Sequence, residues 1–255
     1  MIRYSANLGF LWRELDLPAA IRRAKDAGFA AVECHWPYDE DAGAVRAALI
    51  ETGLPMLGLN TRKGAEEGDF GLAAVPGREA EARAAIEEAF AYADAIGAQA
   101  VHVMAGRAGD DQRGGAVFEA NLRFACDLAA GSGRTVLIEP INGRDVPGYF
   151  LSSVEQAAAI VARLARPELK IMFDCYHTQI TEGDLLTRFE RHQAAIGHVQ
   201  IAAVPSRAEP DEGEVAYPRL LAAFDAAGYD GFIGAEYRPR GRTEDGLRWM
   251  MDFAL

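Results

Sequence analysis

Four acidic or amide side chains lie at the ends of four consecutive apolar segments in the second half of the chain. In chain order they are Glu139, Asp174, Gln200 and Glu236. If these segments are neighbouring strands of one parallel sheet, their carboxyl ends meet at one edge, and the four side chains meet there too. Three carboxylates brought together in this way repel one another unless a cation lies between them. The pattern therefore predicts a carboxylate cluster around a metal ion.

The predicted ligand set contains only oxygen atoms, which favours Mg²⁺, with Mn²⁺ as second choice, over Zn²⁺. Such a cation can bind a substrate carbonyl and the neighbouring hydroxyl, acidify the C–H bond between them and stabilise the resulting enediolate. Glu139 and Glu236 come from the first and last of the four segments, so they can exchange the proton from different sides. The set predicts aldose–ketose isomerisation or epimerisation. Any single acid could instead cap a loop or pair with an arginine, but that explanation fits four equivalent positions poorly.

Five further residues are candidates for contacts with the substrate. His177 lies three residues after Asp174, the second of these segment ends, and could donate to a substrate oxygen or polarise a carbonyl. Arg207, in the loop after the seventh segment, could bind a substrate carboxylate with two parallel N–H groups. Arg62 and Lys63 are further candidates for binding an anion. Asp145 could accept hydrogen bonds from substrate hydroxyls, although a turn-forming aspartate is an equally good interpretation.

Three polar residues in the first half of the chain also lie in or beside apolar segments. His35 and His102 each follow or end a segment, and each is either a residue of the same mouth or a hydrogen-bonded core histidine. Glu33 lies inside an apolar segment, where a carboxylate could orient its neighbours. The sequence leaves both interpretations open for all three residues.

The elements that must position these groups alternate along the chain. Eight strands are predicted, at residues 3–8, 30–34, 56–60, 100–104, 135–139, 170–174, 198–201 and 232–236. Helices are predicted between and after them, at residues 18–27, 42–52, 78–96, 117–130, 153–164, 184–193, 218–227 and 243–253. Eight β-α units in 255 residues fit a closed (β/α)8 TIM barrel. A doubly wound open sheet is the alternative, but no glycine-rich phosphate loop follows the first strand.

Two loops stand out between these elements. Residues 61–77 and 105–116 are long, polar and rich in glycine. They follow the third and fourth predicted strands, so they lie at the same end of the barrel as the four segment-end side chains. Long loops on a compact barrel commonly serve as lids or binding loops. We therefore expect both loops to border the predicted site.

Composition limits the class of protein. Half of the 255 residues are hydrophobic, and we expect residues 1–255 to form a single domain. The 26 basic and 38 acidic residues give a net charge of −12, which disfavours binding to nucleic acid or to anionic membranes. The three cysteines include no CxxC pair, so we expect no disulfide framework. With no signal-peptide or membrane-span pattern, we expect a cytoplasmic protein, and homo-oligomerisation is compatible with the sequence.

In several short stretches the chain resembles the hydroxypyruvate isomerase family of xylose isomerase-like barrels. The stretches are Ser-Ala-Asn-Leu at 5–8, Val-Pro-Gly-Arg-Glu at 75–79, Ile-Glu-Pro-Ile-Asn at 138–142, Asp-Cys-Tyr-His at 174–177, Gly-His-Val-Gln-Ile-Ala at 197–202, Gly-Glu-Val-Ala-Tyr at 213–217 and Gly-Ala-Glu-Tyr-Arg-Pro at 234–239. None of these stretches is decisive alone, but their order and spacing extend the resemblance over nearly the whole chain.

The resemblance implies that the substrate is a small hydroxy-oxo acid, with reversible interconversion of hydroxypyruvate and tartronate semialdehyde. It implies that Glu139 and Glu236 are the catalytic acids and that Asp174 and Gln200 complete the metal shell. In related sugar epimerases a histidine stands at the position of Gln200, whereas hydroxypyruvate isomerases carry a glutamine there. The family carries a histidine after strand six, which matches His177 here. It carries an arginine after strand seven, which matches Arg207.

The chain departs from the family pattern at two places near the substrate. Ala202 and Ala203 stand where some members carry an acidic or amide residue, and residues 60–64 lack the proline common after strand three. These departures leave isomerisation of four-carbon dehydrotetronates and 3-epimerisation of free ketoses open as alternatives. An endonuclease IV-like phosphodiesterase fits less well, because that chemistry uses a histidine-rich zinc cluster and the chain has five histidines. A non-catalytic sugar-acid binder also fits less well, because both catalytic glutamates are present.

Overall fold

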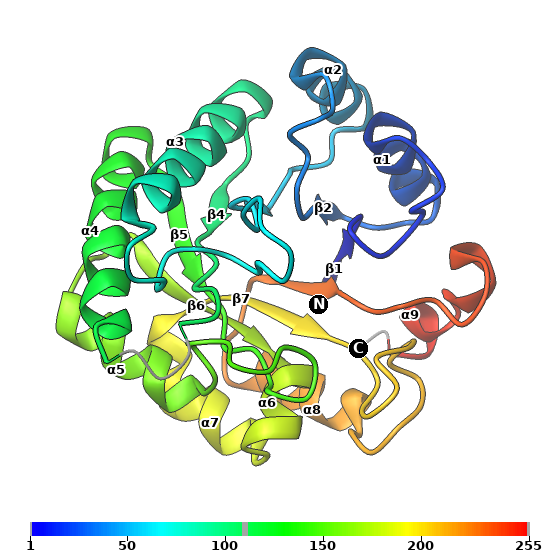
Figure 1. Cartoon of the computed structure of the whole chain (residues 1–255). Coiled ribbons are helices and arrows are strands. Elements are labelled where there is room, and N and C mark those ends of the chain that lie inside the picture. The colour runs from blue at the N-terminus through cyan, green and yellow to red at the C-terminus, as the bar shows by residue number, and fades with distance from the viewer. Residues whose placement is uncertain (1, 109–111, 254–255) are drawn as a thin grey trace.

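A computed structural model describes residues 2–108 and 112–253 of the chain, and eight parallel strands form a near-closed barrel there (Figure 1). The strands are β1 (Arg3–Asn7), β2 (Ala31–Glu33), β3 (Gly58–Asn60), β4 (Ala100–His102), β5 (Thr135–Ile138), β6 (Leu169–Asp174), β7 (Ile196–Ile201) and β8 (Phe232–Ala235). Their order around the sheet is β2-β1-β8-β7-β6-β5-β4-β3. The predicted TIM barrel is confirmed.

The barrel closes between β2 and β3 through a few backbone hydrogen bonds rather than a full ladder. Val32 and Met56 form an isolated parallel bridge. The Leu57 amide donates to the Val32 carbonyl at 2.7 Å, and the Cys34 amide donates to the Gly58 carbonyl at 3.1 Å. These bonds satisfy the polar backbone groups that two open edges would otherwise expose.

Helices surround the barrel as an outer ring (Figure 1). They are α1 (Leu17–Asp26), α2 (Ala42–Thr52), α3 (Glu79–Ile96), α4 (Gly114–Ser132), α5 (Val154–Leu164), α6 (Cys175–Thr181), α7 (Leu185–His192) and α8 (Tyr217–Ala226), followed by the short α9 (Trp249–Asp252). The cap chemistry agrees with the sequence. Ser153 accepts a hydrogen bond from the Gln156 amide at the start of α5, and Gly53 ends α2 in the left-handed conformation, with φ of 68°.

Two helical segments differ from the prediction. The short helix α6 begins directly after β6 and was not predicted; the Asp174 carboxylate caps it by accepting from the Tyr176 amide at 2.6 Å. The single helix predicted over 243–253 is instead a 3₁₀ turn at Thr243–Gly246 followed by α9. Gly246 lies at the end of the 3₁₀ turn, where a Cβ would come within 2.2 Å of the Glu209 carboxylate.

The hydrophobic core lies mainly between the strands and the helices, whereas the barrel interior holds few apolar side chains. Inside the barrel, Ala100, Leu137 and Met172 form a small separate apolar cluster. A cavity of about 260 Å³ extends past them, from the amino-terminal ends of the strands to the polar side chains at the carboxyl ends. His198 and Gln200, two residues apart on β7, line the same cavity, so this face of the strand points inward. The interior therefore leaves room for polar groups below the mouth.

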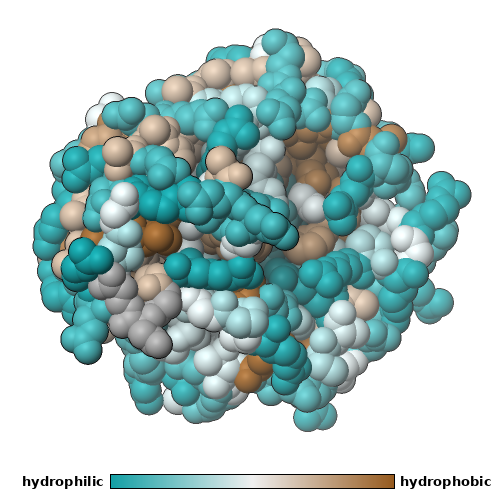
Figure 2. All heavy atoms as spheres, in the orientation of Figure 1, coloured by the Kyte–Doolittle hydropathy of each residue, from teal (hydrophilic) through white to brown (hydrophobic). Residues whose placement is uncertain are grey.

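The outer surface has no broad apolar face on the side that Figure 2 shows, where hydrophilic residues dominate and apolar ones are scattered or lie in hollows. Among the described residues, the exposed large hydrophobic side chains are Leu15, Ile50, Leu186 and Met251. Within the same residues, every helix is too short or too polar to cross a membrane. The three cysteines are buried and unpaired, as expected.

Candidate active site

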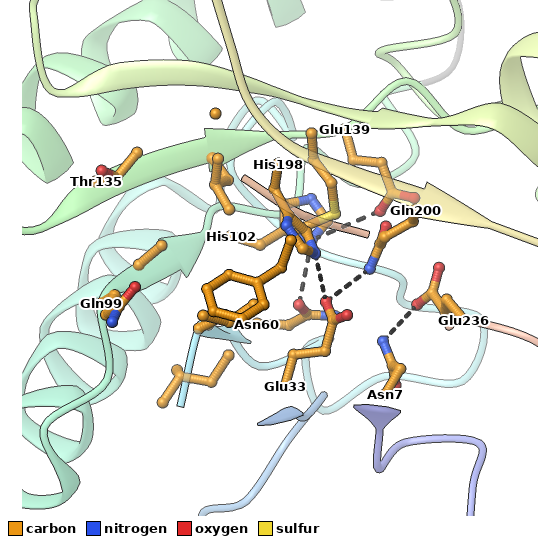
Figure 3. A pocket seen from close by; sticks show the side chains of 18 of the residues that line it. Asn7, Glu33, Asn60, Gln99, His102, Thr135, Glu139, His198, Gln200 and Glu236 are labelled. Atoms are coloured by element: carbon orange, nitrogen blue, oxygen red, sulfur yellow. Dashed lines mark hydrogen bonds and ion pairs between the residues drawn. The ribbon is translucent and has the colours of Figure 1, made fainter. Parts of the chain in front are cut away.

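The barrel brings the four segment-end side chains together at its mouth (Figure 3 shows three of them). Asp174 ends β6 and is in register with Gln200 of β7, which is in register with Gly234 of β8. Glu139 follows β5, and Glu236 follows β8. All four polar side chains are buried, with between 1% and 6% of their surface exposed. The convergence predicted from strand alternation is therefore present.

Oxygen atoms without partners face this mouth. Glu139, Asp174 and His177 each offer one potential ligand atom, and these atoms lie within 4.8 Å of one another. Oε1 of Glu139, Oδ2 of Asp174 and Oε1 of Gln200 are buried and accept no hydrogen bond from the described residues. A buried acceptor without a partner costs free energy on the order of 1–3 kcal/mol. The buried Glu/Asp/His group and these oxygens fit a divalent metal ion.

The electrostatics of β5 and β6 support this fit. Burial, followed by the charges of Glu236 and Asp174, raises the pKa of Glu139 well above its usual range. Burial and the charge of Glu236 raise the pKa of Asp174 to about 8. Without a cation, these two carboxyl groups therefore tend to keep protons at neutral pH. A bound cation would favour their ionised forms instead.

Glu236 lies in the opposite environment. Its Oε1 atom accepts from Asn7 Nδ2 at 3.0 Å and from His35 Nε2 at 2.9 Å. Its Oε2 atom accepts from Arg207 Nη2 at 3.2 Å. Burial alone would raise the pKa of Glu236, but the hydrogen bond from His35 and the charge of Arg207 outweigh it and lower that pKa well below its usual range. Glu236 is therefore held as a carboxylate.

The ring of His177 is oriented by Asn142. The Asn142 backbone amide, which can only donate, lies 3.3 Å from Nδ1 of His177, and the Asn142 side-chain nitrogen lies 2.6 Å from the same atom. Nδ1 therefore accepts, and the neutral ring carries its proton on Nε2. Burial, followed by the charge of Arg207, lowers the pKa of His177 well below its usual value. Because Nε2 lies 3.7 Å from Glu139 Oε1, it presents an N–H donor to the mouth.

Arg207 and Asp145 lie together on the same side of the mouth as Glu236. Arg207 Nη1 donates to Asp145 Oδ2 at 3.2 Å, and its guanidinium lies between the rings of Phe10 and Tyr176, at 4.9 and 5.0 Å from their centroids. Burial would lower the pKa of Arg207, but Glu236 and the other nearby acids raise it. Both substrate-binding candidates are thus brought to the mouth.

The adjacent candidates Arg62 and Lys63 have different surroundings. The Arg62 guanidinium forms a two-bond pair with Glu88 of α3, at 2.7 and 3.1 Å, so its charge is already matched. The Lys63 ammonium lies 3.8 Å from the ring centroid of Trp36. Among the residues that the structure describes, no carboxylate lies within ion-pair distance of Lys63. Only Lys63 of the two keeps a charge available for an anion.

The other polar strand ends also contribute to the mouth. His102 Nδ1 lies 3.2 Å from Asn60 Oδ1 and 3.7 Å from Glu139 Oε2, and burial lowers the pKa of His102 to about 4. Sequence reasoning assigned no role to Asn7, Asn60 or Asn142. Asn60 ends β3 and also the third predicted strand, so its position was a signal in the sequence, whereas Asn7 ends β1 one residue before the first predicted strand ends.

Comparisons with known proteins decide the family. Residues 21–253 match the family model described as xylose isomerase-like TIM barrel. The chain is 46% identical to 2-oxo-tetronate isomerase of Cupriavidus necator, over 99% of both chains. It is 37% identical to hydroxypyruvate isomerase of Escherichia coli, over 98% of both chains. The chain belongs to the hydroxypyruvate/2-oxo-tetronate isomerase family. It is therefore an isomerase, an intramolecular oxidoreductase, and its family implies a small oxo-acid substrate.

A solved structure gives the same fold. The Brucella melitensis protein named AP endonuclease, family 2, is 39% identical to this chain and superposes with a TM-score of 0.95 over 100% of both chains. That name describes the Brucella protein. In this isomerase, the observed mouth contains three histidines, His35, His102 and His177, and the chain carries a net charge of −12. Neither feature fits a histidine-rich zinc cluster that acts on a polyanion.

Proposed function

We propose that the chain interconverts hydroxypyruvate and tartronate semialdehyde, with Glu139 and Glu236 moving the carbon-bound proton. The observation that carries this proposal is the contrast between two buried carboxyl groups at one mouth. Glu236 is held ionised, whereas Glu139 has an unpartnered oxygen and a raised pKa. Two buried carboxyl groups with different partners, on different sides of one mouth, are suited to exchange a proton with one substrate from two directions.

The reaction moves hydrogen between neighbouring carbons. In the forward direction a proton leaves C3 of hydroxypyruvate for one glutamate, and a proton is returned at C2, while the hydroxyl hydrogen passes from O3 to O2. The Nε2–H group of His177 is placed to donate to the oxygen that gains negative charge. The product has the same atoms and the same overall oxidation state as the substrate, so no redox cofactor is needed.

We assign the metal shell to Glu139, Asp174, Gln200 and Glu236. Three of these residues carry the unpartnered buried oxygens, and Glu236 lies close enough to raise the pKa values of both other carboxyl groups. The all-oxygen set favours Mg²⁺, with Mn²⁺ as the alternative. When bound, the ion would polarise the substrate carbonyl and stabilise the charge that develops during proton transfer. His177 is left outside this shell because its Nε2 atom carries the ring proton.

The substrate carboxylate requires a cation in this acidic protein. Arg207 lies at the mouth itself, where it pairs with Asp145 and Glu236 and 11% of its side chain is exposed, and Lys63 has no matched charge among the described residues. We assign carboxylate binding to these two residues, and hydroxyl binding to Asp145. Because Glu88 neutralises Arg62, we assign Arg62 a smaller contribution.

A four-carbon substrate is the second candidate. The 46% identity to 2-oxo-tetronate isomerase favours it, and 2-oxo-tetronate would undergo the same proton transfer with one more hydroxyl-bearing carbon. The small buried side chains of Ala202 and Ala203 directly after β7 are compatible with a longer substrate.

The test is incubation of metal-reconstituted protein with hydroxypyruvate in D₂O, followed by NMR of the carbon-bound protons. We expect tartronate semialdehyde and solvent deuterium exchange, both lost on addition of a chelator. Glu236→Gln protein is the matched control. If conversion occurs only with 2-oxo-tetronate, the four-carbon candidate is correct. Failure with both acids in protein that binds metal would contradict the proposal, and free ketoses would be tested next.

A further inference from the structure

A buried carboxylate that the proposed chemistry does not use lies inside the barrel, below the mouth. Glu33 is the last residue of β2, and 4% of its surface is exposed. It accepts hydrogen bonds from Ser5 Oγ at 3.1 Å, from His198 Nε2 at 3.0 Å and from Gln200 Nε2 at 2.9 Å. Figure 3 shows the last two converging on the Glu33 side chain. One carboxylate thus joins β1, β2 and β7 across the barrel.

The bond to Gln200 fixes which end of its amide faces the mouth. An ionised carboxylate can only accept, so the amide nitrogen of Gln200, and not its oxygen, must face Glu33. The amide oxygen then points away from Glu33. That oxygen, Oε1, is buried and has no partner among the described residues. An amide flipped by 180° has nearly the same shape. Packing alone would therefore not determine whether the oxygen or the nitrogen of Gln200 faces the mouth.

A glycine provides the space that this contact needs. Gly234 of β8 lies in register between Ser5 of β1 and Gln200 of β7. A Cβ at Gly234 would come within 2.3 Å of Glu33 Oε1, 2.8 Å of Gln200 Cγ and 2.9 Å of His198 Nε2. The Glu33 side chain therefore passes over bare backbone to reach β7. Any larger residue at position 234 would displace the carboxylate or the glutamine.

We propose that Glu33 is a positioning residue that sets the amide of Gln200 with its oxygen toward the metal position, and that Gly234 makes this arrangement sterically possible. The proposal rests on the proposed function, in which Gln200 is a metal ligand. Groups that orient a metal ligand in this way commonly change metal affinity by 10–100-fold when they are removed. In this arrangement Glu33 acts through Gln200, to which it is hydrogen-bonded.

The test is Mg²⁺ and Mn²⁺ affinity, measured by titration calorimetry on the wild-type and variant proteins. Glu33→Gln introduces an amide that can donate to Gln200 Oε1 and so permits the flipped orientation. We expect about 10–100-fold weaker metal binding with an unchanged circular dichroism spectrum. Gly234→Ala should weaken binding in the same direction. Gly58→Ala is the matched control, because its Cβ would meet the Ala100 carbonyl at an ordinary 3.5 Å.

A rescue variant separates orientation from a general structural role. In the double variant Glu33→Gln/Gln200→Glu, the new ligand has two equivalent oxygens, so its orientation no longer matters. We expect this protein to bind metal at least as tightly as the wild type. Wild-type affinity in both Glu33→Gln and Gly234→Ala, or failure of the double variant to recover, would overturn the positioning role. If the wild-type protein binds no metal, the proposed ligand set is wrong and the inference fails with it.

Discussion

The two sides of the barrel mouth carry the same type of side chain in opposite electrostatic states. On the β5–β6 side, Glu139 and Asp174 have buried oxygens without partners and raised pKa values. On the β8 side, Glu236 accepts three hydrogen bonds, and its pKa is lowered. Because all three are buried, burial does not explain the difference. The difference comes from the hydrogen-bond donors that β1 and the loops after β2 and β7 supply to Glu236.

This contrast indicates how one mouth can hold a metal ion and still contain a base. The paired side supplies a carboxylate that is ionised before any cation binds. The unpaired side supplies carboxyl oxygens that retain protons without a cation, and a bound cation would displace those protons and stabilise the ionised forms. The two catalytic glutamates of the proposed mechanism are therefore not interchangeable, although the sequence presents them as equivalent strand-end acids.

The largest expected effect is on turnover. Glu139→Gln and Glu236→Gln should each lower kcat by about 10²–10⁴-fold, because an amide cannot accept the carbon-bound proton. Steady-state assays with saturating Mg²⁺ would measure this loss. Near-normal turnover in both variants would contradict the two-carboxylate mechanism.

The same two variants should differ in stability when metal is removed. Glu236→Gln should lower the free energy of unfolding by about 1–3 kcal/mol, because it removes the anion that Asn7, His35 and Arg207 surround. Glu139→Gln should leave that free energy unchanged or raise it, because a neutral amide replaces a group whose charge is disfavoured. Urea unfolding in the presence of a chelator measures both. Equal destabilisation by the two substitutions would contradict the electrostatic difference between the β5–β6 side and the β8 side of the mouth.

In the metal-free protein, the free energy of unfolding should depend on pH through Glu139 and Asp174, the two carboxyl groups on the unpaired side of the mouth. Between pH 7 and 8 the unfolded chain has ionised carboxylates and neutral histidines, whereas the folded protein still holds protons because the pKa of Asp174 is raised to about 8 and that of Glu139 is also raised. The folded state thus binds more protons, and the free energy of unfolding should fall as pH rises. The slope is up to about 1.4 kcal/mol per pH unit for each retained proton.

Below pH 6.5 this slope should flatten, because the buried histidines oppose it. The pKa of His102 is lowered to about 4 and that of His177 is also lowered well below its usual value, so the unfolded chain gains protons there that the folded protein does not. Urea titrations at several pH values test both windows. Saturating Mg²⁺ should abolish the fall between pH 7 and 8, and an unchanged fall would place the metal elsewhere.

The smallest expected effect is on substrate affinity at the rim. Lys63→Ala should raise KM for hydroxypyruvate by about 3–10-fold with little change in kcat, in keeping with loss of a charge contact at a half-buried position. Arg62→Ala, one residue away, should change KM less because Glu88 already matches its charge. Initial-rate kinetics would compare the two variants. A larger effect of Arg62→Ala would show that the pair with Glu88 opens when substrate binds.

The barrel and the converging strand ends were predictable because they depend on local rules. Alternating side-chain direction places Glu139, Asp174, Gln200 and Glu236 on the inward face, and β-α alternation gives a parallel sheet. These rules do not depend on which residues pack against each other. The same rules apply to Asn60, which ends β3 and the third predicted strand.

The pairing of the side chains could not be predicted, because it depends on contacts between residues far apart in the chain. Arg207 meets Asp145 across 62 positions, and Glu33 meets Gln200 across 167. Helix α6 is only seven residues long, so its apolar periodicity was too short to detect. The closed barrel determines which charged side chains pair with one another. These pairings make the two sides of the mouth electrostatically different.

The most direct test of this account is a crystal structure of the protein with Mn²⁺, with the metal located by anomalous diffraction. We predict one ion at the mouth, coordinated by Glu139, Asp174, Glu236 and the amide oxygen of Gln200, with His177 outside the coordination shell. An ion bound by His177 without Gln200, or no ion at the mouth, would contradict the proposed metal shell and the proton-transfer scheme built on it.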